Sequence, residues 1–121
     1  MQHETVVTDL GAVASARGFV RDRCRELGLD PDTVDTVELL TSEVVTNAIL
    51  HGRSEARLRV SGGPGRLRVE VADENSRHPQ PQEADPEALD GRGLAILEML
   101  AARWGVGDRP AGKVVWFEVG A

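Results

Sequence analysis

The sequence has few residues of the kinds that mark disulfide-rich, metal-bound or membrane-spanning proteins. Its one cysteine, Cys24, excludes an internal disulfide and leaves no Cys/His cluster for structural zinc. Aromatic residues make up 3% of the chain and tyrosine is absent, which argues against a stacking platform for nucleic-acid bases. No apolar run approaches the roughly 20 residues of a membrane span, and the first residues do not resemble a signal peptide. We therefore expect a soluble, cytoplasmic protein.

The charge balance restricts the class of partner. The chain has 14 Lys and Arg residues against 20 Asp and Glu residues, for a formal net charge of −6. Because binding to duplex DNA or RNA depends on neutralising phosphates, we expect no nucleic-acid partner. The 121 residues include 40% hydrophobic residues, which is enough for one core. We expect a single domain over residues 1–121.

Hydrophobic periodicity predicts the secondary structure. It indicates a strand near residues 4–8, a helix from Asp9 as N-cap to Gly28 as C-cap, and a second helix from Asp30 to Gly52. Alternation at 56–62 and 66–72 predicts a β-hairpin, and the chain ends with a helix over 93–103 and strands at 104–106 and 114–119. The apolar side of the hairpin is expected to face the core, with Leu58, Val60, Leu67, Val69 and Val71. The other side is expected to face solvent, with Arg57, Arg59, Arg66, Arg68 and Glu70.

Strands and helices in this order do not alternate regularly, which disfavours a doubly wound parallel sheet. We predict an α+β fold, a two-layer α/β sandwich with helices on one face of a mixed, mostly antiparallel sheet. The connection from about residue 73 to residue 92 is long for a small domain, as is typical of lids and binding loops. Its proline and acidic content predicts that it is mobile without a ligand.

The second helix carries a polar pair, Glu43 and Asn47, four residues apart. The pair lies outside the apolar arc of Val34, Val37, Thr41, Val44, Val45 and Ala48, and it is flanked by Leu39, Leu40 and Leu50. Leucines on this second side indicate that it is covered too, which would leave the pair partly buried and in need of partners. An ordinary exposed pair on the shoulder of a helix fits the same spacing.

A Gly-x-Gly sequence, Gly91-Arg92-Gly93, lies at the start of the third helix. Backbone N–H groups at a helix N-terminus can bind an anion, although a flexible hinge before a helix has the same pattern. Two standard nucleotide motifs are excluded. Residues 91–96 lack the third glycine of a dinucleotide fingerprint, and the P-loop-like spacing from Gly107 to Lys113 has Val114 where Ser or Thr is required.

Taken in order, four segments resemble the GHKL ATPase, or Bergerat, fold and within it the anti-sigma factor serine-kinase family. Residues 43–52, with Glu43, Asn47, His51 and Gly52, resemble the N box. Residues 69–73 resemble the strand and aspartate of the first nucleotide box, residues 91–96 the glycine box, and residues 112–116 the closing strand. The resemblance covers nearly the whole chain.

The resemblance implies a site for ATP and Mg²⁺ between the second helix and a lid. It implies that Asn47 holds the Mg²⁺ ion, that Asp73 accepts a hydrogen bond from adenine, and that Glu43 is the catalytic base. Gly91, Arg92, Gly93 and Leu94 would bind the phosphates. The chain departs from the family pattern at Glu74-Asn75-Ser76, where glycines are typical, at Leu89, where an arginine can occur, and at Val114, where a threonine near adenine is common.

The family further implies a function in partner switching. The chain would sequester a sigma factor and phosphorylate a serine of an anti-anti-sigma antagonist of the STAS type, and it could form a homodimer. A binding module that acts by sequestration alone, with ATP as no more than a ligand, is the alternative. The ATPase half of a histidine kinase is disfavoured, because we expect no room in 121 residues for a separate dimerising helix pair.

Overall fold

The computed structural model describes residues 2–52, 55–73, 91–109 and 112–120, and for residues 51–52, 91–94, 108–109 and 112 it describes the backbone alone. The elements, in chain order, are β1 (Gln2–Val7), the 3₁₀ turn η1 (Leu10–Ala12), α1 (Val13–Glu26), α2 (Pro31–Gly52), β2 (Ala56–Gly63), β3 (Arg66–Asp73), α3 (Gly91–Leu100), β4 (Arg103–Arg109) and β5 (Gly112–Gly120).

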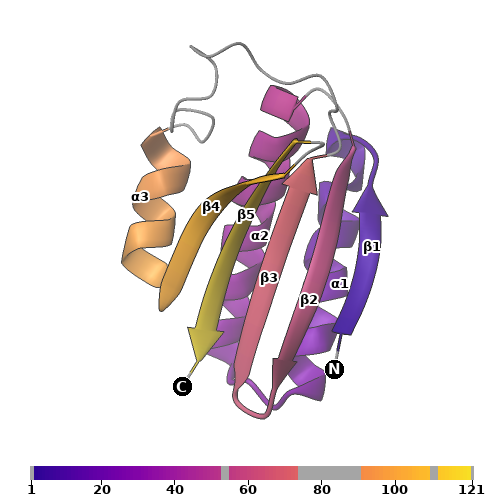
Figure 1. The fold of residues 1–121 in the computed structure, drawn as a ribbon. Coiled ribbons are helices and arrows are strands. Elements are labelled where there is room, and N and C mark those ends of the chain that lie inside the picture. The colour runs from indigo at the N-terminus through magenta and orange to yellow at the C-terminus, as the bar shows by residue number, and fades with distance from the viewer. Residues whose placement is uncertain (1, 53–54, 74–90, 110–111, 121) are drawn as a thin grey trace.

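The strands form one sheet with the order β1-β2-β3-β5-β4. Figure 1 shows the helices on one face of this sheet, so the predicted two-layer α+β fold is confirmed. All four described strand pairs are antiparallel, in agreement with the predicted mostly antiparallel sheet, and no parallel pair occurs among the described strands. Because β3 and β5 are antiparallel neighbours, the end of β3 lies beside the start of β5.

The predicted hairpin is also confirmed, and its apolar side faces the helices. Leu58, Val60, Leu67, Val69 and Val71 are all buried. Phe117 of β5 is completely buried with them, as is Cys24 of α1. Burial raises the pKa of the Cys24 thiol to about 11, so Cys24 is protonated at neutral pH and acts as a small core residue.

Local signals around the first two helices are correct with one exception. Gly28 follows α1 with a φ of +75°, which favours glycine. Asp30 caps α2 by accepting a hydrogen bond from the backbone N–H of Thr33 at 2.8 Å, and this bond lowers the pKa of the Asp30 carboxyl. Asp9, predicted as the N-cap of the first helix, instead precedes η1 and makes no side-chain cap bond, so α1 begins four residues later, at Val13.

The third helix and the strand after it also differ from the prediction. α3 ends at Leu100 instead of residue 103, because the backbone N–H of Ala102 donates a 2.8 Å hydrogen bond to the Glu118 carbonyl of β5. This bond starts the pairing of β4 with β5, and β4 then extends to Arg109. Strand pairing across the sheet, which a local pattern does not contain, therefore sets this boundary.

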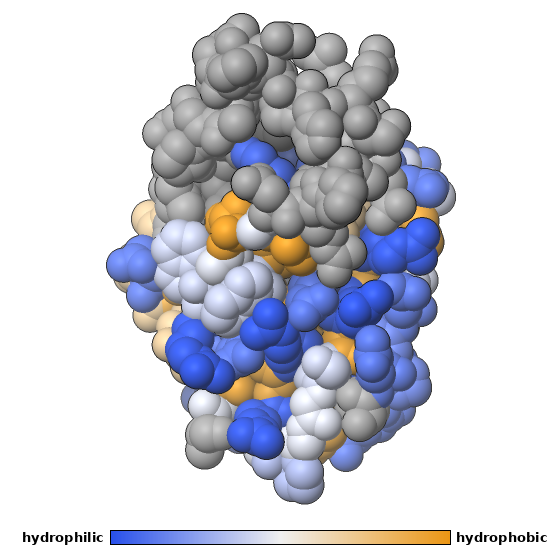
Figure 2. Space-filling model, in the orientation of Figure 1, coloured by the Kyte–Doolittle hydropathy of each residue, from blue (hydrophilic) through white to orange (hydrophobic). Residues whose placement is uncertain are grey.

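The open face of the sheet carries a row of cross-strand ion pairs. Glu4 of β1 contacts Arg59 of β2 at 3.3 Å, and Arg59 contacts Glu70 of β3 at 3.8 Å. Arg68 then donates to Glu118 of β5 at 2.7 Å, and Arg103 of β4 also donates to Glu118. The predicted solvent-facing arginines are therefore mostly paired and half-buried, and Figure 2 shows a hydrophilic band across this face.

Two neighbouring leucines of α2 provide a test of the core. Leu40 is fully buried, whereas Leu39 is 40% exposed. We predict that Leu40→Ala lowers the free energy of unfolding by about 2–5 kcal/mol, because it removes buried methyl groups and leaves a cavity. Leu39→Ala, the matched control, should change it by no more than about 1 kcal/mol. Urea unfolding measures both values, and equal losses would contradict the assigned face of α2.

The ion pairs of Glu118 predict a pH dependence. Hydrogen bonds from Arg68 and Arg103 lower the pKa of Glu118 below its ordinary value of 4.5. A carboxyl group whose pKa is lower in the folded state stabilises the fold above its unfolded pKa, and it loses that contribution as the pH falls through the folded pKa. Glu118→Gln should therefore be less stable than the parent at pH 7, and the difference should shrink below about pH 4.5. A difference independent of pH, measured by urea unfolding, would rule out this role.

Candidate functional site

Four chain segments meet at one end of the sheet. β3 ends there at Asp73 and β5 begins there, since the two strands are antiparallel neighbours. Figure 1 shows that α2 ends and α3 begins at the same end. The elements that carry the sequence-predicted site residues of the described chain therefore end or begin at the same end of the sheet. Residues 74–90 of the predicted lid lie outside the described residues.

Asn47 is the buried polar side chain of this end. It is 5% exposed, and its Nδ2 atom has no hydrogen-bond partner among the described residues. The amide can rotate by 180° without changing its shape, so the unpaired position can present either the nitrogen or the oxygen. Thr41 also has a buried, unpaired hydroxyl, but it lies two turns earlier, in the predicted apolar arc of α2. Asn47 is thus the unpaired buried group at the open end of the helix layer.

Glu43 lies one turn before Asn47 on the same side of α2, about 6 Å along the helix axis. Its side chain is half-buried. The expectation that leucines on this side are covered is wrong for Leu39 and Leu50, which are 40% and 52% exposed, and correct for Leu40. Only the side of the pair that carries Leu40 is therefore covered by the rest of the protein. Asn47 lies closer to Leu40 around the helix than Glu43 does. As a result Asn47 is buried and Glu43 keeps access to solvent.

Asp73 is the last residue of β3. Residues alternate between the two faces of a strand, and Val69 and Val71 are buried under the helices. Asp73 therefore points to the same helix-covered face, where it is half-buried. Its carboxylate lies at the edge of the core, beside the ends of β2 and β5.

Gly91, Arg92, Gly93 and Leu94 form the first turn of α3, which begins two residues earlier than predicted. The first four N–H groups of a helix have no partner within the helix, so this turn supplies backbone donors at the same end of the sheet. The side chains of Arg92 and Leu94 lie outside the described atoms. Only the backbone placement of these four residues is therefore established.

Lys113 is a residue at this end to which the sequence analysis gave no role. In β5, alternate residues face the helices, and three of them are buried there: Val115, Phe117 and Val119. Lys113 continues this alternation and lies on the same face. Val114, the position expected near adenine, shares the opposite face with Trp116, which contacts Arg68 at 4.2 Å. The alternation of β5 was visible in the sequence. The missing information was the pairing of β5 with β3, which brings Lys113 next to Asp73.

A divalent cation at this site would need ligands from outside the described side chains as well. No group of three or more His, Cys, Asp or Glu residues that could hold a metal occurs in the described ranges. The Asn47 amide oxygen suits a hard cation such as Mg²⁺, which commonly takes one or two protein oxygens and fills its other positions with water and phosphate oxygens. The residues present fit a nucleotide-bound Mg²⁺ and do not form an all-protein metal cage.

A hollow lies at the opposite end of α2 from Asn47. It has a volume of about 260 Å³, and its lining includes Asp32, Thr36, Leu100 and Val119. Thr36 is three helical turns from Asn47, so this hollow is separate from the predicted site. In the described part of the chain, no helix is long and apolar enough to cross a membrane.

Comparison with known families agrees with this geometry. Residues 6–119 match the histidine kinase-like ATPase domain family. The match covers almost the whole chain, and the protein belongs to this family of ATP-using, kinase-type domains. The predicted membership of the GHKL superfamily is thereby confirmed, and the family implies ATP, typically with Mg²⁺, as the ligand. No curated protein matches the chain.

Two solved structures show the same fold. The structure of the RsbU and RsbW domains of Rv1364c from Mycobacterium tuberculosis matches with a TM-score of 0.71 and 20% identity, over 98% of this chain and 32% of that chain. The histidine kinase domain of the blue-light activated histidine kinase EL346 from Erythrobacter litoralis matches with a TM-score of 0.54 and 28% identity, over 92% of this chain and 58% of that chain. This chain thus spans less than two thirds of either protein.

Asn47 gives a prediction that separates binding from folding. Asn47→Ala should abolish Mg²⁺-dependent ATP binding, measured by calorimetry. It should leave the free energy of unfolding without ligand within about 1 kcal/mol of the parent. The substitution loses buried packing, but it also removes an unpaired buried amide that itself costs about 1–3 kcal/mol. Thr36→Ala, on the same strip of α2 at its other end, is the matched control and should bind ATP normally. Unchanged ATP affinity in Asn47→Ala would remove Asn47 from the site.

Proposed function

We propose that this protein is an ATP-dependent serine kinase and anti-sigma factor that acts by partner switching. It would hold a sigma factor inactive and phosphorylate a serine on an anti-anti-sigma antagonist. The observation that carries the proposal is the buried, unpaired amide of Asn47 in a chain that belongs to the ATPase family. It lies on α2, which ends at the same end of the sheet as β3 and the start of α3. The fold shared with a structure that contains an RsbW domain supports the choice of partners.

Each residue has a proposed role in binding ATP. The Asp73 carboxylate accepts a hydrogen bond from the adenine amino group, which explains a half-buried acid at the end of a core strand. Asn47 would hold Mg²⁺ through its amide oxygen, and that ion would supply positive charge to the phosphates. The first turn of α3, Gly91 to Leu94, offers backbone N–H groups to the phosphates, with Arg92 as an added positive charge.

Glu43 is the proposed general base. Its carboxylate accepts the proton of the incoming serine hydroxyl while the serine oxygen forms a bond to the γ-phosphorus. The bond from that phosphorus to the oxygen bridging the β- and γ-phosphates breaks, and ADP leaves. Because positioning and charge neutralisation supply most of the acceleration in phosphoryl transfer, the base must lie beside the phosphates and remain open to a partner. The half-buried position of Glu43 supports the second need, and its place one turn before Asn47 on α2 supports the first.

Mass spectrometry tests the transfer directly. The protein is incubated with Mg-ATP and candidate antagonists of the STAS type, and gain of one phosphoryl group on an antagonist serine is the expected result. Glu43→Gln should keep ATP affinity within about twofold and lose transfer by about 10²- to 10⁴-fold, the usual contribution of a general base. Glu38→Gln is the matched control, because Glu38 faces α1 and contacts Arg21 at 3.9 Å.

The outcomes distinguish the two functions considered. Full transfer by Glu43→Gln would exclude Glu43 as the base. Binding of ATP and a sigma factor with no transfer to any antagonist would contradict the kinase assignment and leave a sequestration module. Absence of ATP binding in the parent protein would contradict the proposed function as a whole.

A further inference from the structure

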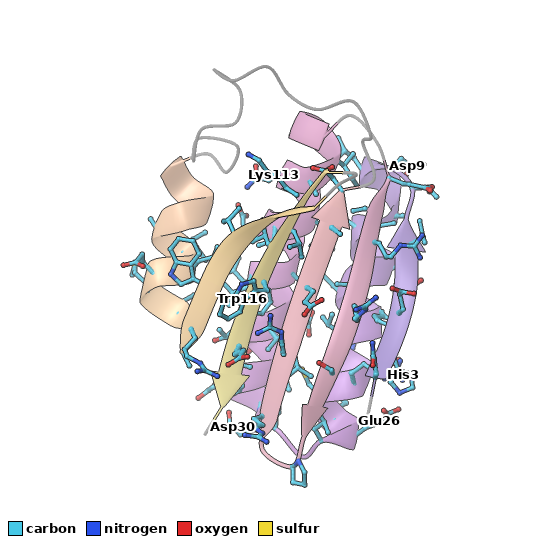
Figure 3. The ribbon with its side chains drawn as sticks, in the orientation of Figure 1. His3, Asp9, Glu26, Asp30, Lys113 and Trp116 are labelled. Atoms are coloured by element: carbon cyan, nitrogen blue, oxygen red, sulfur yellow. The ribbon has the colours of Figure 1, made fainter. Side chains whose placement is uncertain are left out.

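Lys113 is the single lysine of the chain, and its position in β5 turns it toward the nucleotide end of the helix layer. β3 and β5 pair without a break up to Ala72 opposite Val114. Extended by one position, this antiparallel register would place Lys113 opposite Asp73. On its other side Lys113 pairs with Asp108 of β4, whose side chain lies outside the described atoms. Each residue lies two positions from a buried valine of the helix-covered face: Lys113 comes before Val115, and Asp73 comes after Val71. Figure 3 shows Lys113 at the end of the sheet near which α2 ends and α3 begins.

Among the described side chains, the ammonium group of Lys113 has no ion pair or hydrogen bond. This is unusual in a chain with six more acidic than basic residues. Most of the described arginines donate to an acceptor, as Arg68 does to Glu118 at 2.7 Å. Lys113 is half-buried, so its charge is also less well hydrated than that of an exposed lysine. A half-buried, unpaired cation at a predicted anion site indicates that an anionic ligand completes its contacts.

We propose that Lys113 binds a phosphate group of the nucleotide and fixes the phosphate chain between Asp73 and the first turn of α3. The inference rests on the proposed ATP site and adds a residue to it. Lysine carries a compact charge on a flexible chain of four methylene groups, which suits a phosphate oxygen and gives a reach of about 6 Å from its backbone. Adenine offers no negative charge, so the phosphates are the part of ATP that this cation recognises.

The proposal also offers a replacement for the arginine that the family can carry at position 89. A cation from the closing strand would replace a cation from the loop. Lys113 lies on an interior strand of the sheet, where β5 pairs with β3 on one side and β4 on the other. The backbone of such a strand is in place before the nucleotide binds, so that only the lysine side chain has to be ordered on binding.

Calorimetry with two ligands tests this contact. Mg-ATP and adenosine are titrated into the parent protein, Lys113→Met, Lys113→Arg and Arg66→Met. Lys113→Met should weaken Mg-ATP binding about ten- to a hundredfold, the range for a hydrogen bond to a charged group, and change adenosine binding by less than about twofold. Lys113→Arg should recover most of the ATP affinity. Arg66→Met removes one exposed positive charge from the opposite end of β3 and should behave as the parent.

The contrary results are equally specific. Equal losses for ATP and adenosine in Lys113→Met would overturn the proposal, since Lys113 would then support the base site or the fold. Unchanged ATP affinity in Lys113→Met, with normal binding by the parent, would overturn it while the proposed function stands. If the parent itself binds no ATP, both the proposed function and this inference are wrong. Melting curves of the four proteins without ligand show whether each variant folds.

Discussion

The inward placement of Asn47 is the constraint on which the candidate site depends. An amide buried to 5% exposure with an unpaired Nδ2 atom destabilises the folded chain. The burial follows from the orientation of α2 about its own axis. Asp30 caps the first turn of α2, and the buried valines of its apolar arc pack against the sheet. A ligand that supplies the missing contact would recover that free energy on binding. The free-energy cost of the unpaired amide therefore favours a role for Asn47 in binding over a role in stabilising the fold.

The sheet supplies the rest of the site by bringing distant segments together. Because β5 pairs antiparallel with β3, the end of β3 at Asp73 lies beside the start of β5, which carries Lys113 40 positions further along the chain. The charge pairs on the open face, from Glu4 to Arg103, lie on the other side of the same strands. One face of the sheet thus pairs most of its described charged side chains with one another, and the other face carries Asp73 and Lys113 half-buried at the rim of the core.

Local sequence signals predicted what depends on neighbours along the chain. The Asp30 cap, the Gly28 C-cap and the alternation of the hairpin each rest on a few adjacent residues, and each is confirmed. The signals failed where contacts between distant segments decide. Ala102 ends α3 by bonding to β5, Leu39 and Leu50 stay exposed because no described element covers them, and Lys113 gains its neighbour through strand pairing. Periodicity located Glu43 and Asn47 on one strip, and the fold showed that Asn47 alone is buried.

A crystal structure of the protein with Mg²⁺ and a non-hydrolysable ATP analogue tests the central claim most directly. The account predicts that the Asn47 amide oxygen lies about 2.1 Å from the metal, with the phosphates against the first turn of α3 and adenine beside Asp73. A nucleotide bound elsewhere, with the Asn47 amide still buried and unpaired, would contradict it.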